Sequence, residues 1–125
     1  MSYGTGPGPL AIAHRGGAAL APENTLDAFE RSVALGVRYL ETDVRLTADG
    51  ELVCFHDEQL EARTTGWGRV GERTLAELRA VLVRGPEGRL APIPTLAEAL
   101  DGMPLGPRQI DWLTGRELAL ACARS

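Results

Sequence analysis

Residues 37–47 read VRYLETDVRLT, and this stretch decides the fold class. Its side chains alternate along the chain, which is typical of a β-strand whose two faces have different surroundings. The alternation places two sets of residues on opposite faces, Leu40, Thr42, Val44 and Leu46 on one and Tyr39, Glu41, Asp43 and Arg45 on the other. The sequence therefore predicts a strand over residues 37–47.

Further strands are predicted on both sides of this stretch. A short apolar run over residues 10–13 ends at His14, and another over residues 52–55 ends at His56 and Asp57. Asp49 and Gly50 form a turn signal that predicts a hairpin between residues 37–47 and 52–55. Residues 108–113 predict one more strand.

Helical patterns lie between these strands. Apolar residues at helical spacing follow Asn24, which we expect to cap a helix that ends near Gly36. Two capping-box pairs predict further helices near residues 75 and 96, namely Thr74 with Glu77 and Thr95 with Glu98. Residues 85–94 are expected to form a loop and residues 116–123 a last helix. Strands that alternate with helices predict an α/β fold with a mainly parallel sheet.

The composition narrows the class of protein. The chain has 125 residues, of which 44% are hydrophobic and 24% charged, as in ordinary soluble domains. Its net charge is −4 and its basic residues form no cluster, which argues against a nucleic-acid partner. No apolar run approaches the roughly 18 residues of a membrane span. Residues 1–9 are polar and rich in Gly and Pro, so we expect a flexible leader, no secretion signal and a cytoplasmic protein.

Ionisable residues gather at the predicted strand ends, where parallel α/β sheets bind ligands. Glu41 and Asp43 are two positions apart, so their carboxylates point to the same side of the strand. Such oxygen ligands suit Mg²⁺ or Ca²⁺. A solvent-exposed acidic edge paired with Arg38 or Arg45 is the alternative interpretation.

The histidines and one arginine could carry the remaining chemistry. His14 and His56 are the only histidines, and two imidazoles at strand ends could act as general acid and base. Arg15 precedes Gly16 and Gly17, a combination that could bind a phosphate. The alternatives are loop histidines with a structural role and a glycine turn beside a solvated arginine.

Several motifs together resemble a known family. They are HRGG at residues 14–17, PENT at 22–25, ETDV at 41–44, TADG at 47–50, HD at 56–57 and IPTL at 93–96. Their order and spacing are similar to the N-terminal signature of the glycerophosphodiester phosphodiesterases, over about residues 10–100. The resemblance implies a TIM barrel of the (β/α)₈ type. Because a complete barrel needs about 250 residues, we expect only an N-terminal partial barrel, with residues 10–125 as a truncated domain.

The resemblance also implies roles for particular residues. It suggests His14 and His56 as the acid and base, Arg15 as a phosphate contact, and Glu41 and Asp43 as ligands of Mg²⁺ or Ca²⁺. Asp111 could supply a third acidic ligand, although Leu113 stands where the family usually has a lysine two residues later. The reaction implied is hydrolysis of a glycerophosphodiester to glycerol 3-phosphate and an alcohol, through a cyclic phosphate formed by the substrate's own glycerol hydroxyl.

Three alternatives stay open at the level of sequence. One is an inactive truncated remnant that at most binds a divalent cation or a phosphate ligand without turnover. Another is a partial barrel that completes itself by self-association through open sheet edges. The last is a related barrel phosphodiesterase that acts on sphingolipids or phosphoinositides.

Overall fold

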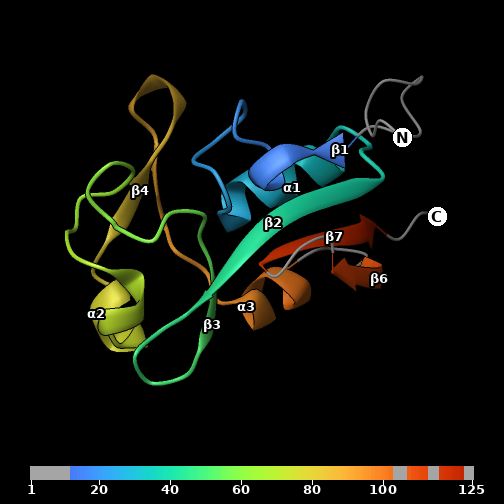
Figure 1. Ribbon diagram of the computed structural model, residues 1–125. Coiled ribbons are helices and arrows are strands. Elements are labelled where there is room, and N and C mark those ends of the chain that lie inside the picture. The colour runs from blue at the N-terminus through green and yellow to red at the C-terminus, as the bar shows by residue number, and fades with distance from the viewer. Residues whose placement is uncertain (1–11, 103–106, 113–115, 123–125) are drawn as a thin grey trace.

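The computed structural model describes residues 12–102, 107–112 and 116–122, and the expected leader of residues 1–9 lies outside this part (Figure 1). Strands and helices are interspersed along the chain, although three pairs of consecutive strands have no α-helix between them, β2 and β3, β4 and β5, and β6 and β7. The strands are β1 (Ile12–Ala13), β2 (Tyr39–Leu46), β3 (Leu52–Cys54), β4 (Leu82–Arg84), β5 (Leu90–Pro92), β6 (Pro107–Trp112) and β7 (Glu117–Cys122). The helices are α1 (Leu26–Ala34), α2 (Leu75–Leu78) and α3 (Leu96–Asp101), with 3₁₀ turns at His14–Gly16, Val70–Glu72 and Pro86–Gly88. The predicted α/β class is confirmed.

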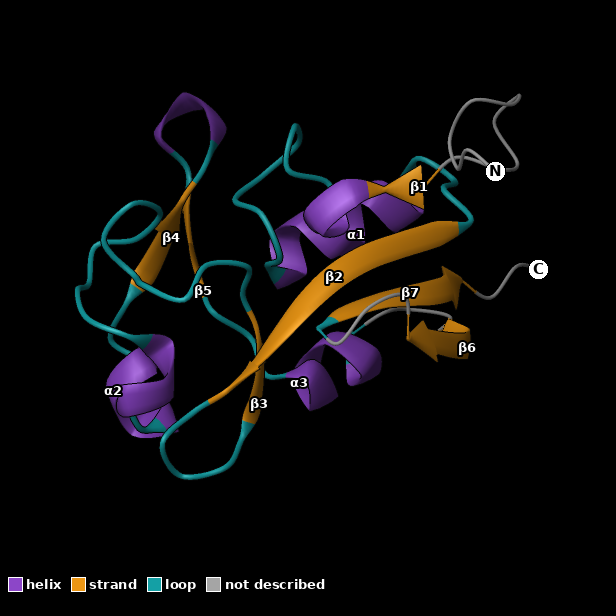
Figure 2. Cartoon of the chain, in the orientation of Figure 1, coloured by secondary structure: helices purple, strands orange, loops and turns teal. Residues whose placement is uncertain are grey.

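The larger sheet is built around β2, the long strand that crosses the middle of Figure 2. Its order is β1-β2-β7-β6, and β3 pairs with the far end of β2. β1 runs parallel to β2, whereas β3 and β7 are antiparallel to β2, and β6 is antiparallel to β7. The expectation of a mainly parallel sheet is therefore wrong for the described strands, because the segments beside β2 reach it through reversals of the chain.

The last described strand replaces a predicted helix. Residues 116–123 are rich in Ala and Leu, which favours a helix, yet Glu117–Cys122 form β7. Leu118 is fully buried in this strand. β2 lies on one side of β7 and β6 on the other, so two ladders of hydrogen bonds outweigh a helix propensity of a few tenths of a kcal/mol per residue.

A second reversal lies in the segment expected to be a loop. Residues 85–94 contain β5, which pairs antiparallel with β4 in a separate two-stranded sheet. The Pro86–Gly88 turn closes this hairpin, and Glu87 and Gly88 have φ of 58° and 75° within it. The Gly and Pro residues that suggested a loop thus form the turn of a hairpin.

Helix starts and stops follow local chemistry. Both capping boxes form. The Thr74 and Thr95 hydroxyls accept from the backbone N–H groups of Glu77 and Glu98, and the Glu77 and Glu98 carboxylates accept from the backbone N–H groups of Thr74 and Thr95. In α1 the N-cap is Thr25, and the prediction of Asn24 is wrong by one position. Asn24 has φ 58°, in the left-handed region, and places Thr25 in the extended conformation that an N-cap needs.

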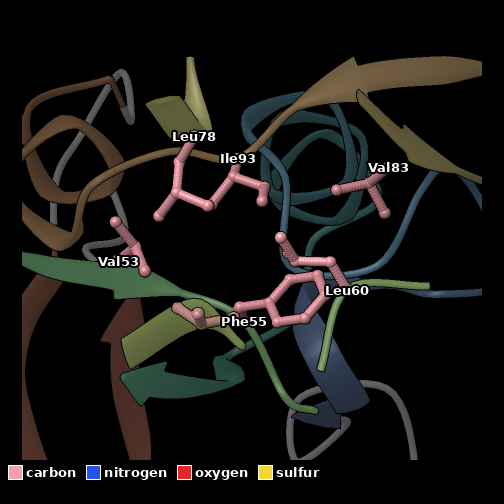
Figure 3. Close-up of a cluster of buried hydrophobic side chains, with 7 residues drawn as sticks. Val53, Phe55, Leu60, Leu78, Val83 and Ile93 are labelled. Atoms are coloured by element: carbon pink, nitrogen blue, oxygen red, sulfur yellow. The ribbon is translucent and has the colours of Figure 1, made fainter. Parts of the chain in front are cut away.

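Two hydrophobic clusters meet along β3. One contains Phe29, Leu40, Val44, Cys54, Ala99 and Leu118, between the larger sheet and helices α1 and α3. The other contains Val53, Phe55, Leu60, Val70, Leu78, Val83 and Ile93, and Figure 3 shows six of these side chains pointing toward one another. Val53 and Cys54 are neighbours on β3 and face opposite sides, so this strand joins the two cores. Among the described residues, no helix is long and apolar enough to cross a membrane.

Candidate metal and phosphate site

The acidic pair of β2 lies inside the protein. Glu41 and Asp43 are each only 4% exposed, so the solvent-exposed acidic edge is excluded. The antiparallel register places Glu117 of β7 directly opposite Asp43. One carboxylate oxygen from each of Glu41, Asp43 and Glu117 lies within 4.8 Å of the other two. Three carboxylates therefore converge on one small volume.

This convergence changes how readily the carboxylates ionise. Burial raises the pKa of Glu41 to about 7, opposed by the hydrogen bond from the Arg15 backbone and increased by Asp43 and Glu117. Burial also raises the pKa of Asp43, opposed by the hydrogen bond from Asn24. Removing a charge from water and placing like charges together both disfavour ionisation. A cation at this place would remove the repulsion.

The loop before α1 holds Asp43 in position. The Nδ2 amide of Asn24 donates to Asp43 Oδ2 at 3.3 Å, and its Oδ1 accepts from the Thr42 hydroxyl at 2.9 Å. Asn24 and Thr42 are themselves buried, with 1% and 0% exposure. Both ends of the amide are thus used, which fixes its orientation and that of Asp43 Oδ2.

Arg15 contacts the acidic cluster through its backbone. Its N–H donates to Glu41 Oε1 at 2.8 Å. Arg15 has φ 50°, and its carbonyl accepts from the N–H of Asn24, the other left-handed residue of the site, at 2.7 Å. Each such conformation costs on the order of 1–3 kcal/mol in a non-glycine residue. The short contacts around both residues hold them there.

The side chain of Arg15 belongs to a closed ring of five ionisable groups. Its Nη1 lies 3.2 Å from Glu23 Oε1, and its Nη2 lies 3.2 Å from His56 Nε2. His56 Nδ1 lies 2.7 Å from Asp57 Oδ1. Arg63 completes the ring, 3.7 Å from Asp57 Oδ2 and 3.8 Å from Glu23 Oε1. The ring thus consists of the two predicted residues Arg15 and His56 together with Glu23, Asp57 and Arg63.

These contacts define which nitrogen of His56 carries the proton. A guanidinium can only donate, so His56 Nε2, beside Arg15, acts as an acceptor and is unprotonated. Nδ1 then carries the hydrogen and donates to the Asp57 carboxylate. In this arrangement the lone pair of His56 Nε2 is directed at Arg15, and the Asp57 carboxylate orients the imidazole ring.

The donor set fits a hard divalent cation. Its three groups are carboxylates, and Mg²⁺ and Ca²⁺ prefer oxygen ligands. Two of the carboxylates are buried, and each accepts a hydrogen bond from an uncharged donor, Glu41 from the Arg15 backbone and Asp43 from the Asn24 amide. Neither Cys nor His belongs to the group, which makes a thiophilic metal a poor match.

Four of the six predicted site residues lie together in the structure, and the side chains of the other two lie outside the described atoms. The structure brings Arg15, Glu41, Asp43 and His56 together in one network. His14 opens the 3₁₀ turn after β1, and its side chain lies outside the described atoms. Asp111 lies on β6 in register with Ala119, which pairs on its other side with Glu41. The side chain of Asp111 is also outside the described atoms, so its role as a ligand stays a prediction.

Four members of the site were not among the predicted site residues, namely Glu23, Asp57, Arg63 and Glu117. Glu117 was assigned to a helix, and only the register between β2 and β7 brings it to Asp43. Arg63 lies in a stretch rich in Thr, Gly and Arg that carries no local signal for contact with Glu23 or Asp57. Glu23 and Asp57 are acidic residues of the PENT and HD motifs, and this was the available hint for these two.

Comparisons of sequence place the chain among known proteins. The model of the glycerophosphoryl diester phosphodiesterase family matches residues 14–118. A glycerophosphodiester phosphodiesterase of Caldanaerobacter subterraneus subsp. tengcongensis is 43% identical over 95 residues, which cover 74% of this chain and 39% of that protein. A probable glycerophosphodiester phosphodiesterase 1 of Mycobacterium tuberculosis is 49% identical over 71 residues, covering 57% of this chain and 26% of that protein.

Solved structures agree with these relatives. A phosphodiesterase of Oleispira antarctica in complex with the product sn-glycerol-3-phosphate is 40% identical, with a TM-score of 0.68 over 74% of this chain and 38% of the other. A glycerophosphodiester phosphodiesterase of Agrobacterium tumefaciens is 37% identical, with a TM-score of 0.67 over 72% of this chain and 40% of the other. The chain thus spans at most about two fifths of the length of these proteins. Since the family pattern covers residues 14–118 and so includes the acidic cluster and the ring around Arg15, the chain belongs to the glycerophosphoryl diester phosphodiesterase family.

Proposed function

We propose that residues 10–125 form the N-terminal part of a (β/α)₈-barrel phosphodiesterase domain that hydrolyses glycerophosphodiesters to glycerol 3-phosphate and an alcohol. The observation that carries this proposal is the direct link between the acidic cluster and the ring. Arg15 donates to Glu41 through its backbone and to His56 and Glu23 through its side chain. A cation site, a phosphate-binding guanidinium and a proton acceptor therefore adjoin one another.

A divalent cation, Mg²⁺ or Ca²⁺, is the cofactor in this proposal. Glu41, Asp43 and Glu117 would hold it, because their oxygens already converge. When bound, the cation would polarise the phosphodiester and offset the negative charge that grows in the transition state. Asp111 is the competing candidate for the third ligand. The variants Glu117→Gln and Asp111→Asn separate the two candidates, because the loss of a true ligand should weaken cation binding.

The protein's own groups would move the protons. Arg15 would bind a phosphate oxygen with its guanidinium. One of His56 and His14 would accept the proton of the attacking glycerol hydroxyl, and the other would donate a proton to the leaving alcohol. The cyclic phosphate formed by this attack would then be opened by water, with the two histidines in exchanged roles. The Asp57 carboxylate would keep His56 in the required tautomer.

Hydrolysis of glycerophosphocholine in the presence of Mg²⁺ or Ca²⁺ tests the proposal. We expect turnover that EDTA abolishes and that falls by about 10²–10⁴-fold in His14→Ala and in His56→Ala. Glu72→Gln is a matched control, because Glu72 is exposed in the Val70–Glu72 turn and takes no part in the ring. A folded sample that binds the cation without turnover would overturn the proposal and support the inactive remnant.

A further inference from the structure

A cavity of about 440 Å³ adjoins the ring of ionisable groups. Glu23 and Arg63 belong to both the ring and the cavity wall, which Arg84, Gly85 and Pro86 also line. One oxygen of Glu23 lies 3.2 Å from Arg15 and 3.8 Å from Arg63. The Glu23 carboxylate therefore lies between the cavity and Arg15, the proposed phosphate contact.

The hairpin of β4 and β5 fixes part of the cavity wall. The N–H of Arg84 donates to the carbonyl of Arg63 at 2.8 Å, which holds these two arginines side by side. Gly85 packs so closely that a Cβ there would lie 2.5 Å from the backbone N of Pro22. Pro22 directly precedes Glu23, so the tip of the hairpin is seated on the same loop that supplies Glu23.

The charges around the cavity are unbalanced. Arg15 and Arg63 share Glu23, and Arg63 also faces Asp57. The guanidinium of Arg84 is exposed and makes no ion pair within 4.0 Å among the described residues. The wall thus offers a cation whose charge is not neutralised, next to a site that already binds an anion in the proposed function.

We propose that this cavity receives the alcohol side of the substrate and selects one that carries an anionic group, a carboxylate or a second phosphate. The inference rests on the proposed function, since it extends the site at Arg15. In a serine head group, one oxygen and two carbon atoms separate the phosphorus from the carboxyl carbon, so the anionic group of a diester held at Arg15 would lie only a few bonds from the phosphate, on the side of the cavity that Glu23 and Arg84 line. A quaternary ammonium in the same place would face Arg84 and be repelled.

Binding of the probes to the full chain, measured by NMR titration with EDTA present so that they are not hydrolysed, and hydrolysis, measured separately after Mg²⁺ is added, test this selectivity. The probes are glycerophosphoserine, bis(glycerophospho)glycerol, the neutral-headed glycerophosphoglycerol, and glycerophosphocholine. We expect one or both of the first two to bind about 10-fold more tightly than glycerophosphocholine, and the stronger of them identifies carboxylate or phosphate as the favoured group. Arg84→Gln should remove this preference and leave the affinity for glycerophosphoglycerol unchanged.

Arg89→Gln is the matched control. Arg89 lies on the same hairpin, is exposed, and pairs with Asp27 at 3.6 Å outside the cavity, so the loss of one positive charge there should leave the preference intact. Equal affinity for all four probes, tighter binding of glycerophosphocholine, or an equal effect of the two variants would overturn the inference. Selective binding without hydrolysis would overturn the proposed function and support the inference.

Discussion

At the scale of single residues, the site depends on backbone conformations that side-chain chemistry alone does not favour. Arg15 and Asn24 both have positive φ, and one hydrogen bond of 2.7 Å joins their backbones. Asn tolerates the left-handed region better than most residues, whereas Arg has no such advantage. The left-handed turn at Arg15 presents its N–H to Glu41 and its guanidinium to His56. The strained backbone of Arg15 thus lets this residue contact both the acidic cluster and His56 of the ring.

Gly16, next to Arg15, is the most tightly constrained glycine of the site. It has φ 69°, and a Cβ there would lie 2.0 Å from Cε1 of Phe29, which is 1% exposed. Gly16→Ala should therefore add overpacking, on the order of 1–3 kcal/mol, to the strain of positive φ. Gly50→Ala is the control, with φ 83° and no atom within 4 Å of the added Cβ. Urea unfolding should show Gly16→Ala as the less stable variant, and equal stability would contradict this packing.

Which site residues could be predicted also depends on scale. Arg15, Glu41, Asp43 and His56 were identified because each lies in or just after a predicted strand and because the motifs that contain them resemble a known family. Glu117 could not be identified in that way, since its neighbours favour a helix and its place depends on pairing with Asp43. A residue whose role follows from strand register carries no local signal in a single sequence.

At the scale of elements, signals confined to a few residues were reliable. The Asp49-Gly50 turn forms the β2–β3 hairpin, in which Leu46 pairs with Leu52. Both capping boxes form as predicted. The strands that were not predicted are β4 and β5, which pair with each other across a short turn, and β7, which is held between β2 and β6. Hydrogen bonds between neighbouring residues can be predicted from the local sequence, whereas the pairing of strands depends on the fold as a whole.

The capping box of α3 should make stability depend on pH. Hydrogen bonds from Arg79 and from the Thr95 backbone lower the pKa of Glu98 below its usual 4.5. A carboxyl with a lowered folded-state pKa stabilises the fold above its unfolded-state pKa, and this stability is lost as the pH falls through the folded-state pKa. Glu98→Gln should therefore cost stability at pH 7 and progressively less below about pH 4.5. Chemical denaturation at several pH values measures this difference.

The magnitude and the control follow from exposure. The side chains of Arg79 and Glu98 are 42% and 41% exposed, so their ion pair should contribute less than about 1 kcal/mol. A double-mutant cycle with Arg79→Gln isolates that pair from the cap. If Glu98→Gln were equally destabilising at pH 3 and pH 7, the charge of Glu98 would have no part in stability.

At the scale of the whole molecule, the acidic cluster connects the central strand to the last described one. β2 supplies Glu41 and Asp43, β7 supplies Glu117, and Leu40 and Leu118 of the same two strands belong to one buried cluster. Like charges directly across a strand pair oppose that pairing. The stability of the larger sheet should therefore depend on what neutralises the three carboxylates.

A divalent cation should raise the thermal stability of the whole chain. A ligand that binds only the folded state stabilises it by about 2.7 kcal/mol at 100 times its dissociation constant, so the midpoint of unfolding should rise with Mg²⁺ or Ca²⁺ concentration. Glu41→Gln and Glu117→Gln should abolish that rise, and in EDTA both should unfold at a higher temperature than the wild type, because each removes a repelling charge. Glu72→Gln, an exposed carboxylate of the Val70–Glu72 turn, should behave like the wild type. A cation response that survives in both cluster variants would place the binding site elsewhere. If instead each variant unfolds at a higher temperature than the wild type in EDTA and at a lower one with the cation, the carboxylates weaken the sheet on their own and stabilise it through the ion.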